Sequence, residues 1–347
     1  PELFQSACAL PASDGLWAWL RKTSPRSVEA LDAAVRVLTW RNSQADSPFD
    51  GGLNGLSDHF TEVFGADYLW SVSRLEAYHT CPFYFLVSRV LGLEPREEPV
   101  AGVDARQQGD IYHKVLERVY QAVDDPTALD QLITALPSVA RSVLDAAPER
   151  LGFRRTAWWE QTRREMVDNV RRSLEALSEE KQRGDFVPTL YEAAFGMRGE
   201  PSLVVRDRGS GDAFQLRGVI DRVDQDAESR LRIIDYKRGG PSRYGSSSLR
   251  RGEKIQLPLY ALAARDALQL GEPVSGFYWH VRDAEPSPFK LEDFGPEEAI
   301  RTAVGHAWEA IRSAREGRFT PETATNDCPP FCPAARFCWH YRPGYRR

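Results

Sequence analysis

Two runs of apolar and polar residues, joined by a short acidic segment, dominate the middle of the chain. In residues 216–239, LRGVIDRVDQDAESRLRIIDYKRG, apolar positions lie on both sides of the polar stretch 224–228. This pattern predicts two β-strands joined by a hairpin turn. Side chains of a strand alternate between the two faces of a sheet. Asp235 and Lys237 are therefore expected on one face and Tyr236 on the other.

Pairing about that turn is expected to bring Asp221 within a residue or two of Asp235 in register. Two carboxylates and the Lys237 ammonium group would then share one surface. Such a surface suits a hard divalent cation and the water molecule that the cation polarises. Taken alone, an Asp-x-Lys pattern is more often an ordinary ion pair on a solvated hairpin. The other patterns of the chain decide between the two interpretations.

Helical and strand patterns recur on both sides of the hairpin. The expected helices span 16–22, 28–40, 74–79, 83–90, 106–123, 127–184 (with 158–181 as the longest piece), 255–269 and 296–317. The expected strands span 187–196, 203–206, 214–224, 231–237 and 274–281. Ser73 and Glu76 fit a capping box that starts the helix at 74–79. These patterns predict a chain that mixes helices with a sheet.

The start of the chain is expected to stand apart from the rest. Turn-forming residues are concentrated at 42–55, which indicates a linker after two short helices. Because the chain begins with Pro1 in the middle of a pattern, we interpret it as a segment of a longer polypeptide. Residues 1–58 then form a helical leader or the end of a preceding domain, and residues 59–347 form the main domain. Cys8 is interpreted as a bystander.

Composition narrows the class of protein. The chain has 347 residues, of which 42% are hydrophobic, and this is enough for a substantial core. Its formal net charge of −5 gives no overall basic field, so binding of nucleic acid would require local basic patches. No apolar run approaches the ~20 residues of a membrane span, and no signal peptide is visible, so no membrane partner is expected. Five cysteines argue against a secreted disulfide framework and for a reducing, cytoplasmic compartment.

Local basic patches occur in two places. Segment 238–254 follows Lys237 directly and is rich in Gly, Ser and Arg, so it is well placed to hold a phosphate backbone. Its cationic residues are Arg238, Arg243, Arg250, Arg251 and Lys254. Paired arginines at 163–164 and 171–172 lie on a predicted helix. Such pairs are usually a solvated face, and the alternative is a track that binds phosphates.

His113, Gln256 and Tyr260 are further candidates for a functional site. His113 lies next to the apolar face of the helix at 106–123. It is either a hydrogen-bonded histidine at the edge of the core or a metal ligand that uses its neutral imidazole. Gln256 and Tyr260 are four residues apart, so they share one face of the helix at 255–269.

Three cysteines are concentrated near the end of the chain, in an irregular segment that contains several prolines. Cys328, Cys332 and Cys338 lie within eleven residues, which indicates metal ligation. The fourth ligand is either the nearby His340 or the distant Cys81. A link from Cys81 to Cys328 would close a loop worth roughly 5 kcal/mol of chain entropy. Four thiolates suit a [4Fe–4S] cluster or a structural zinc ion, and the absence of paired Cys-x-x-Cys motifs favours the cluster.

Four motifs in a fixed order carry a family resemblance. They are GDIYHKVLE (109–117), GVIDRVD (218–224), IIDYKRG (233–239) and QLPLYALA (256–263). They resemble the successive motifs of the RecB-like branch of the PD-(D/E)XK nucleases. Cys81 and the three C-terminal cysteines resemble the iron–sulfur staple of AddB-type helicase–nuclease subunits and of the related CRISPR adaptation nucleases. The resemblance covers about residues 68–340, and its one departure is a first cysteine gap of three residues instead of two.

The resemblance implies an α/β fold with a PD-(D/E)XK restriction-endonuclease-like core. In such a core a mixed central sheet is flanked by helices, here with helical insertions. It also implies a [4Fe–4S] staple that joins the N- and C-terminal parts of the domain. The implied ligands of the cluster are Cys81, Cys328, Cys332 and Cys338.

The resemblance also assigns roles in the catalytic site. It implies that Mg²⁺ or Mn²⁺ is bound by His113, Asp221, Asp235 and the carbonyl group of Tyr236. Lys237 would orient the attacking water and offset the charge that grows on the phosphate. Two residues of a Gln-x-x-x-Tyr element would position the DNA backbone, namely Gln256 and Tyr260. Glu192 resembles an acidic residue on the preceding strand of such nucleases.

The implied activity is that of a Mg²⁺-dependent deoxyribonuclease, an exonuclease on single strands in double-strand-break repair. Its partners would be DNA, as single strands or duplex ends, and an ATP-dependent helicase. The helicase would lie elsewhere in the polypeptide or in another chain, since no G-x-x-x-x-G-K-[ST] motif occurs here. The main alternative is a catalytically silent, nuclease-like module that binds DNA or serves as a scaffold in a larger helicase complex. A third interpretation is a zinc-stapled regulator in which the Asp-Tyr-Lys motif is incidental.

Overall fold

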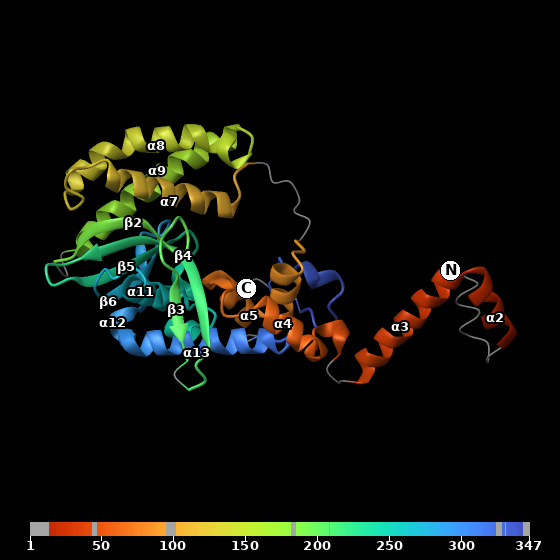
Figure 1. Cartoon of the computed structure of the whole chain (residues 1–347). Coiled ribbons are helices and arrows are strands. Elements are labelled where there is room, and N and C mark those ends of the chain that lie inside the picture. The colour runs from red at the N-terminus through yellow and green to blue at the C-terminus, as the bar shows by residue number, and fades with distance from the viewer. Residues whose placement is uncertain are drawn as a thin grey trace.

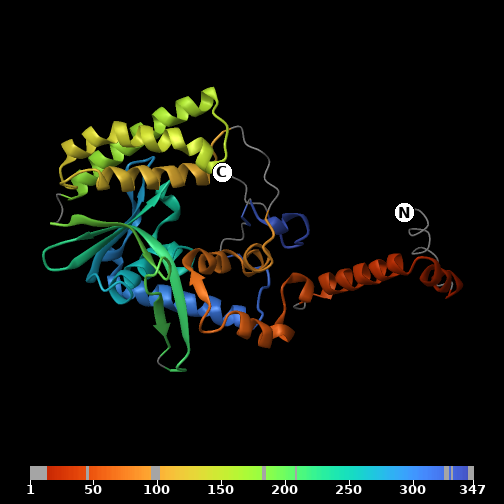
Figure 2. The ribbon, with the colours of Figure 1, turned by 45° about the horizontal axis from the view of Figure 1, so that its top comes forward.

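A mixed sheet of seven strands lies between two layers of helices (Figures 1 and 2). This computed structural model describes residues 14–43, 47–94, 102–181, 185–207, 209–323, 328–329 and 331–342. The expected α/β architecture, a mixed central sheet flanked by helices, is therefore confirmed. Within the described residues, no helix is long and apolar enough to cross a membrane.

The long strand β4 (Ala213–Gln225) organises the sheet. Its first part pairs in parallel with β1 (Leu69–Ser71) and antiparallel with β3 (Leu203–Arg206). Its second part pairs antiparallel with β2 (Val187–Phe195) and β5 (Arg230–Lys237). The expected hairpin is thus formed by β4 and β5. Arg222 lies opposite Ile234, which puts Asp221 and Asp235 at the next position of the same register.

Two further strands extend the sheet beyond β5. Strand β6 (Glu272–His280) runs parallel to β5, as expected for strands joined by a helical crossover. Strand β7 (Glu285–Lys290) pairs antiparallel with β6 and forms the edge. Strand β7 was not predicted from the sequence, because its two prolines cannot donate ladder hydrogen bonds and are tolerated only on an edge strand. Strand β1 was also missed, since it has only three residues.

Three long helices cover one face of the sheet. They are α7 (Ala105–Gln121), α8 (Leu129–Leu151) and α9 (Ala157–Lys181), and they form the upper layer in Figure 1. A capping box of Asp104 and Gln107 starts α7. The apolar sides of these helices pack on side chains of β5 and β6. The largest fully buried side chains of this layer are Ile111, Leu116, Trp159 and Trp279.

A second group of helices covers the opposite face. They are α5 (Val72–Thr80), α11 (Gln256–Asp266), α12 (Leu291–Phe294) and α13 (Pro296–Arg315). Helix α11 is packed on all sides, since every residue from 257 to 264 is buried. This burial explains why the QLPLYALA motif is apolar around the whole helix rather than along one stripe.

Short irregular elements connect these helices. The predicted helix at 83–90 is a four-residue helix, α6 (Pro82–Phe85), continued by a π-helical turn, η3 (Leu86–Val90). The basic segment after β5 contains the turn η4 (Pro241–Arg243) and the short helix α10 (Ser246–Arg250). The cysteine-containing tail has one 3₁₀ turn, η5 (Pro333–Arg336).

Helices α2 (Asp14–Thr23) and α3 (Pro25–Ser43) project away from the sheet in both views (Figures 1 and 2). The turns η1 (Pro48–Asp50) and η2 (Asn54–Leu56) and the helix α4 (Ser57–Val63) follow. Backbone hydrogen bonds tie residues 51–53 to residues 317–319 at the end of α13. The division at residue 58 stays a prediction. Cys8 lies outside the described residues.

The predicted capping box at the start of α5 is wrong. The helix begins at Val72, Ser71 is its N-cap, and no side chain caps it. The Glu76 carboxylate instead accepts hydrogen bonds from the backbone N–H groups of Ile255 and Gln256, at 2.9 and 3.2 Å. A contact with a distant segment has therefore replaced the local one that the sequence pattern indicated.

A buried charge cluster fixes the end of the hairpin. Asp224 is fully buried and accepts hydrogen bonds from Arg222 (2.5 and 2.9 Å) and from Arg232 (2.9 and 3.2 Å). Arg222 also donates to the Tyr120 hydroxyl at 2.6 Å, and its guanidinium lies 4.5 Å from the centre of that ring. The cluster joins α7 to the sheet through paired charges.

Replacement of Asp224 by Asn is expected to destabilise the fold by about 3–5 kcal/mol, because two buried guanidinium groups would lose their counter-charge. Urea denaturation followed by circular dichroism measures the change. The matched control is Glu228→Gln in the exposed hairpin turn, where a change within about 0.5 kcal/mol is expected. Unfolding of Asp224→Asn at the wild-type midpoint would contradict this account.

Candidate active site

His113, Asp221 and Tyr236 meet where α7 packs on β4 and β5. The backbone N–H of Tyr236 donates to Asp221 Oδ2 at 2.6 Å. His113 Nε2 donates to the Tyr236 carbonyl at 2.9 Å, and Nδ1 lies 3.2 Å from Asp221 Oδ1. The structure therefore brings together a histidine, a carboxylate and a carbonyl group from three elements. All three were candidates from the sequence.

Asp235 and Lys237 lie on the opposite face of β5 from the Tyr236 ring, as the alternation of the strand predicts. Lys237 Nζ is 2.5 Å from Asp235 Oδ2 and donates to Gln256 Oε1 at 2.9 Å. Asp235 is only 1% exposed, and its Oδ1 has no hydrogen-bond donor among the described residues. A buried carboxylate oxygen without a donor is costly unless a cation or water satisfies it.

Helix α11 supplies a hydrogen-bond acceptor for Lys237. Its first residue, Gln256, accepts the Lys237 hydrogen bond, and Tyr260 lies one turn later on the same side of the helix. The Tyr260 ring packs edge-on against Phe195. A Cβ atom on Gly218 would lie 2.9 Å from both rings, so the glycine of the GVID motif makes room for this packing.

Glu192 joins the site from β2, in the position opposite Asp221. Ligand atoms of His113, Glu192 and Asp221 all lie within 4.8 Å of one another. The Glu192 backbone has φ +51°, in the left-handed region that a glutamate rarely adopts within a strand. Such strain is often found at functional sites. From the sequence, Glu192 was supported only by the family resemblance; the geometry adds an independent reason to include it.

Burial and neighbouring charges shift the pKa values of these groups in opposite directions. Burial, with the Asp221 charge, raises the pKa of Asp235 to about 6 and also raises that of Glu192. For Asp221 the protonated His113 outweighs burial and lowers the pKa of the carboxyl group. Burial opposes protonation of His113 itself, but the Asp221 charge prevails and raises its pKa to about 9.

The donor set fits a hard divalent cation. Carboxylate and carbonyl oxygens, such as those of Asp221, Glu192 and Tyr236, are the ligand types that Mg²⁺ and Mn²⁺ prefer, and the His113 imidazole lies beside them. Burial, together with the nearby Asp221 charge, raises the pKa values of Asp235 and Glu192, and a bound cation would offset this. The unpartnered Oδ1 of Asp235 is available as one such ligand.

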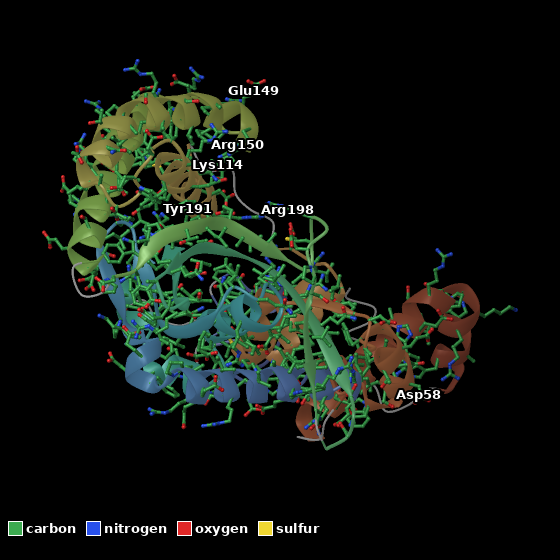
Figure 3. All side chains as sticks on the ribbon, turned by 60° about the vertical axis from the view of Figure 1, so that its left-hand side comes forward. Asp58, Lys114, Glu149, Arg150, Tyr191 and Arg198 are labelled. Carbon is green, nitrogen blue, oxygen red and sulfur yellow. The ribbon has the colours of Figure 1, made fainter. Side chains whose placement is uncertain are left out.

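A cavity of about 410 Å³ opens in front of His113 and Glu192. Lys114 and Arg150 line it from the helical layer, and Arg198 lines it from the turn after β2. Figure 3 shows these three cations at the junction between the helices and the sheet. Asp110 and Glu117 line it as well, and Lys114 Nζ lies 2.5 Å from Glu117 Oε2. The cavity therefore opens onto His113 and Glu192 from a rim of mixed charge.

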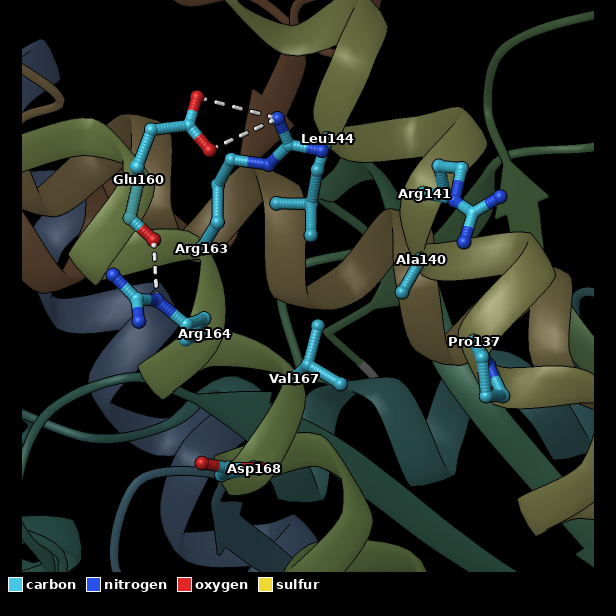
Figure 4. Close-up of a pocket in the computed structure, with 9 residues that line it drawn as sticks. All are labelled: Pro137, Ala140, Arg141, Leu144, Glu160, Arg163, Arg164, Val167 and Asp168. Carbon is cyan, nitrogen blue, oxygen red and sulfur yellow. Dashed lines mark hydrogen bonds and ion pairs between the residues drawn. The ribbon is translucent and has the colours of Figure 1, made fainter. Parts of the chain in front are cut away.

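Arginines of the two predicted basic patches form ion pairs and ring contacts with nearby residues of the chain. Arg251 pairs with Glu253, and the Arg250 guanidinium lies over the Phe294 ring. Another cavity, of about 560 Å³, lies between α8 and α9 (Figure 4). Its Arg163 pairs with Asp145 at 2.5 Å and with Glu160 at 3.5 Å. These contacts agree with a solvated ion-pair surface at 163–164.

Four cysteines from the two ends of the domain line one cavity of about 270 Å³. They are Cys81, Cys328, Cys332 and Cys338, and among the described residues they are the cysteines that the structure places. Cys81 is buried where α5 ends and α6 begins. His340, the other candidate for a fourth ligand, also borders the cavity, but its Nε2 lies 3.7 Å from Asp50 Oδ2.

Burial shifts the pKa values of these thiols. Burial raises the pKa of Cys338 to about 11 and also raises those of Cys81 and Cys332, with smaller contributions from the other thiols. The backbone N–H of Arg342 donates to Cys328 Sγ at 3.2 Å. Such N–H···S bonds are typical of metal-bound thiolates. Cys81 is buried and the other three cysteines are partly exposed, and no three of their Sγ atoms lie within 4.8 Å of one another. A metal centre in this cavity would hold its thiol ligands deprotonated.

The raised pKa of His113 offers a pH test of the site in chelator-treated protein. Its pKa of about 9 in the folded state exceeds the ordinary value of 6.5. The stabilisation that protonated His113 gives to the folded state is therefore complete below pH 6.5, and it is lost as the pH rises through 9. The unfolding free energy of the wild type minus that of His113→Gln should fall over this range, by at most about 3 kcal/mol. A difference that stays constant between pH 6.5 and 9, in urea titrations, would contradict the assigned ion pair.

Comparison with known proteins agrees with this geometry. Residues 69–339 match the family model of the PD-(D/E)XK nuclease superfamily. The B-type ATP-dependent helicase/deoxyribonuclease subunit of Moorella thermoacetica is 30% identical over 234 residues, which are 61% of this chain and 19% of that protein. The subunit of the same name from Ruminiclostridium cellulolyticum is 28% identical over 295 residues, or 80% of this chain and 24% of that protein.

The matched region is a small part of each relative. The chain spans about a fifth of the length of the curated relatives that it matches. The family match, by contrast, covers most of this chain and includes every candidate residue of the acidic site, from His113 on α7 to Tyr260 on α11. The chain belongs to the PD-(D/E)XK nuclease superfamily.

Proposed function

We propose that this domain hydrolyses phosphodiester bonds of DNA with the help of Mg²⁺ or Mn²⁺. Two pairs lie at neighbouring positions of β4 and β5: His113 with Asp221, and Lys237 with Asp235. Together with the buried, unpartnered oxygen of Asp235, they are the observation that carries the proposal. The bound cation would supply positive charge and lower the pKa of its water. The relatives, which are named as helicase/deoxyribonuclease subunits, support DNA as the substrate.

Each residue has a distinct part in this proposal. Asp221, Asp235, His113 and the Tyr236 carbonyl would hold the cation, and Glu192 is added to this set because of its place beside His113 and Asp221. Lys237 keeps its proton, since Asp235 and Asp221 raise its pKa despite burial. A fixed ammonium group there would orient the attacking water and stabilise the charge that develops on the phosphate.

Gln256 and Tyr260 are proposed to act mainly through Lys237. Tyr260 is 7% exposed and packs beneath β4, which supports a role in holding Gln256 rather than in touching a long substrate. The contact with DNA is better placed at the cationic side chains among the residues that line the cavity, namely Arg150, Arg198 and Lys114. Phosphate oxygens are the groups that such side chains bind.

We also infer a [4Fe–4S] cluster at the four cysteines. The convergence of Cys81 with Cys328, Cys332 and Cys338 on one cavity supports a metal centre of four thiolates. A cluster is favoured over zinc because the cysteines do not form paired Cys-x-x-Cys motifs. The centre would join the first and last parts of the domain, which agrees with its place beside α6 and η5.

In the cell, this domain is proposed to act in the cytoplasm as part of a helicase–nuclease. Single strands or duplex ends released by an ATP-dependent helicase, in the same polypeptide or a partner, would be degraded during double-strand-break repair. The names and greater length of the relatives support this setting. A catalytically silent module that only binds DNA is the alternative, and a cleavage assay with and without EDTA distinguishes the two.

Replacement of Asp235 or Lys237 by Ala is expected to lower Mg²⁺-dependent cleavage of end-labelled single-stranded DNA by about 10²–10³-fold or more, because each removes charge that stabilises the transition state. Binding of DNA, measured by fluorescence anisotropy in Ca²⁺, should stay close to wild type. Asp266→Ala, at an exposed position on α11, is the matched control. Undiminished cleavage in either variant would refute the roles assigned here, and a wild type without any EDTA-sensitive product would favour the silent module.

Replacement of Cys81, Cys328, Cys332 or Cys338 by Ala is expected to remove the brown iron–sulfur absorbance. It should also lower the melting temperature by about 5–10 °C, since the closed loop is released. Iron and acid-labile sulfide analysis of protein purified without oxygen measures the loss. Cys8→Ala is the matched control and should retain both. Colourless wild-type protein with stoichiometric zinc would overturn the cluster in favour of a zinc centre.

A further inference from the structure

The first turn of α11 is capped from a distant helix. Ile255, at the N-cap position of α11, has no side-chain group that could bond the free N–H groups of the helix start. Glu76 of α5 supplies the cap instead. One of its oxygens, Oε1, accepts from the N–H of Ile255 at 2.9 Å and of Gln256 at 3.2 Å. The next N–H, of Leu257, donates to the Tyr278 hydroxyl at 3.0 Å.

The Glu76 carboxylate is held in place from both sides. Its second oxygen, Oε2, lies 3.5 Å from Lys254 Nζ, and the side chain is 15% exposed. The Glu76 charge is the main reason that the pKa of Lys254 is raised. A negative charge at this point also faces the positive end of the α11 dipole. The arrangement is thus a charged cap supplied across the fold.

The capped residue is the one that holds the catalytic lysine. The Gln256 backbone N–H donates to Glu76, and its side-chain Oε1 accepts a hydrogen bond from Lys237 Nζ at 2.9 Å. Lys237 in turn lies 2.5 Å from Asp235 Oδ2. A continuous series of contacts therefore runs from α5 through the start of α11 to the ammonium group.

We propose that Glu76 is a positioning residue for catalysis: by fixing the first turn of α11 it sets Gln256, and through Gln256 the position of Lys237. Helix α5 is followed directly by Cys81, one of the four cysteines that line the cavity described above. Glu76 lies five positions before Cys81, about 7.5 Å along a helix. Only the kinetic test of this role of Glu76 depends on the DNA hydrolysis proposed above.

The kinetic test compares Glu76→Ala and Glu76→Gln with wild type in Mg²⁺-dependent cleavage of single-stranded DNA. Glu76→Ala should lower kcat about 10- to 100-fold with KM changed less than about threefold, since a small displacement of a catalytic group has effects of this size. Glu76→Gln keeps an oxygen acceptor for both N–H groups and should restore kcat to within about fivefold of wild type. The matched control is Glu298→Ala on the exposed side of α13, which should retain wild-type kcat.

A second measurement does not depend on activity. Hydrogen–deuterium exchange of the peptide covering residues 250–260 should rise in Glu76→Ala and stay near wild type in Glu76→Gln and Glu298→Ala. Wild-type kcat or unchanged exchange in Glu76→Ala would overturn the proposal. Equal losses in Glu76→Gln and Glu76→Ala would also overturn it. If the wild type shows no Mg²⁺-dependent cleavage, the proposed hydrolysis fails, and the exchange result alone decides the role of Glu76.

Discussion

Charged groups buried in the middle of the sheet are the constraint on which the rest of the structure depends. Asp221 and Asp235 lie on adjacent strands and are only 8% and 1% exposed, so their carboxylates depend mainly on partners within the protein or on a bound ligand. Asp221 is stabilised by the Tyr236 N–H and by His113. Asp235 has only the Lys237 ammonium group on one oxygen. This imbalance leaves one acidic oxygen for a ligand of positive charge, and nuclease chemistry of this family becomes possible there.

The two helical layers contribute different parts of the site. The layer of α7, α8 and α9 brings His113 over β5 and carries two of the cations that line the entrance. The opposite layer brings α11, whose Gln256 accepts the hydrogen bond of Lys237. The three carboxylates of the site, Glu192, Asp221 and Asp235, come from strands β2, β4 and β5 and not from either helical layer. The site therefore exists only where sheet and both layers meet, and a loss of packing on either side would displace one of its groups.

The cysteine-lined cavity lies where chain segments distant in sequence converge. Cys81 stands between α5 and α6, and the other three thiols come from the tail. Helix α5 then continues from this cavity to the start of α11, where Glu76 bonds the helix N-terminus. The same short helix thus borders two sites of different chemistry. This placement explains why an acidic residue within an otherwise ordinary helix is only 15% exposed.

The sequence by itself determined the periodic elements and the identity of the chemical groups. Alternation around the hairpin predicted the face of Asp235 and Lys237, and the register that pairs Arg222 with Ile234 agrees with it. Local patterns suffice for such features because they depend on near neighbours. Tertiary structure alone decided which distant groups meet. Glu76 caps α11 rather than α5, and Asp224 binds two arginines. Glu192, whose own backbone is in the left-handed region, lies beside His113. No local pattern encodes these contacts, because each joins segments that only folding brings together.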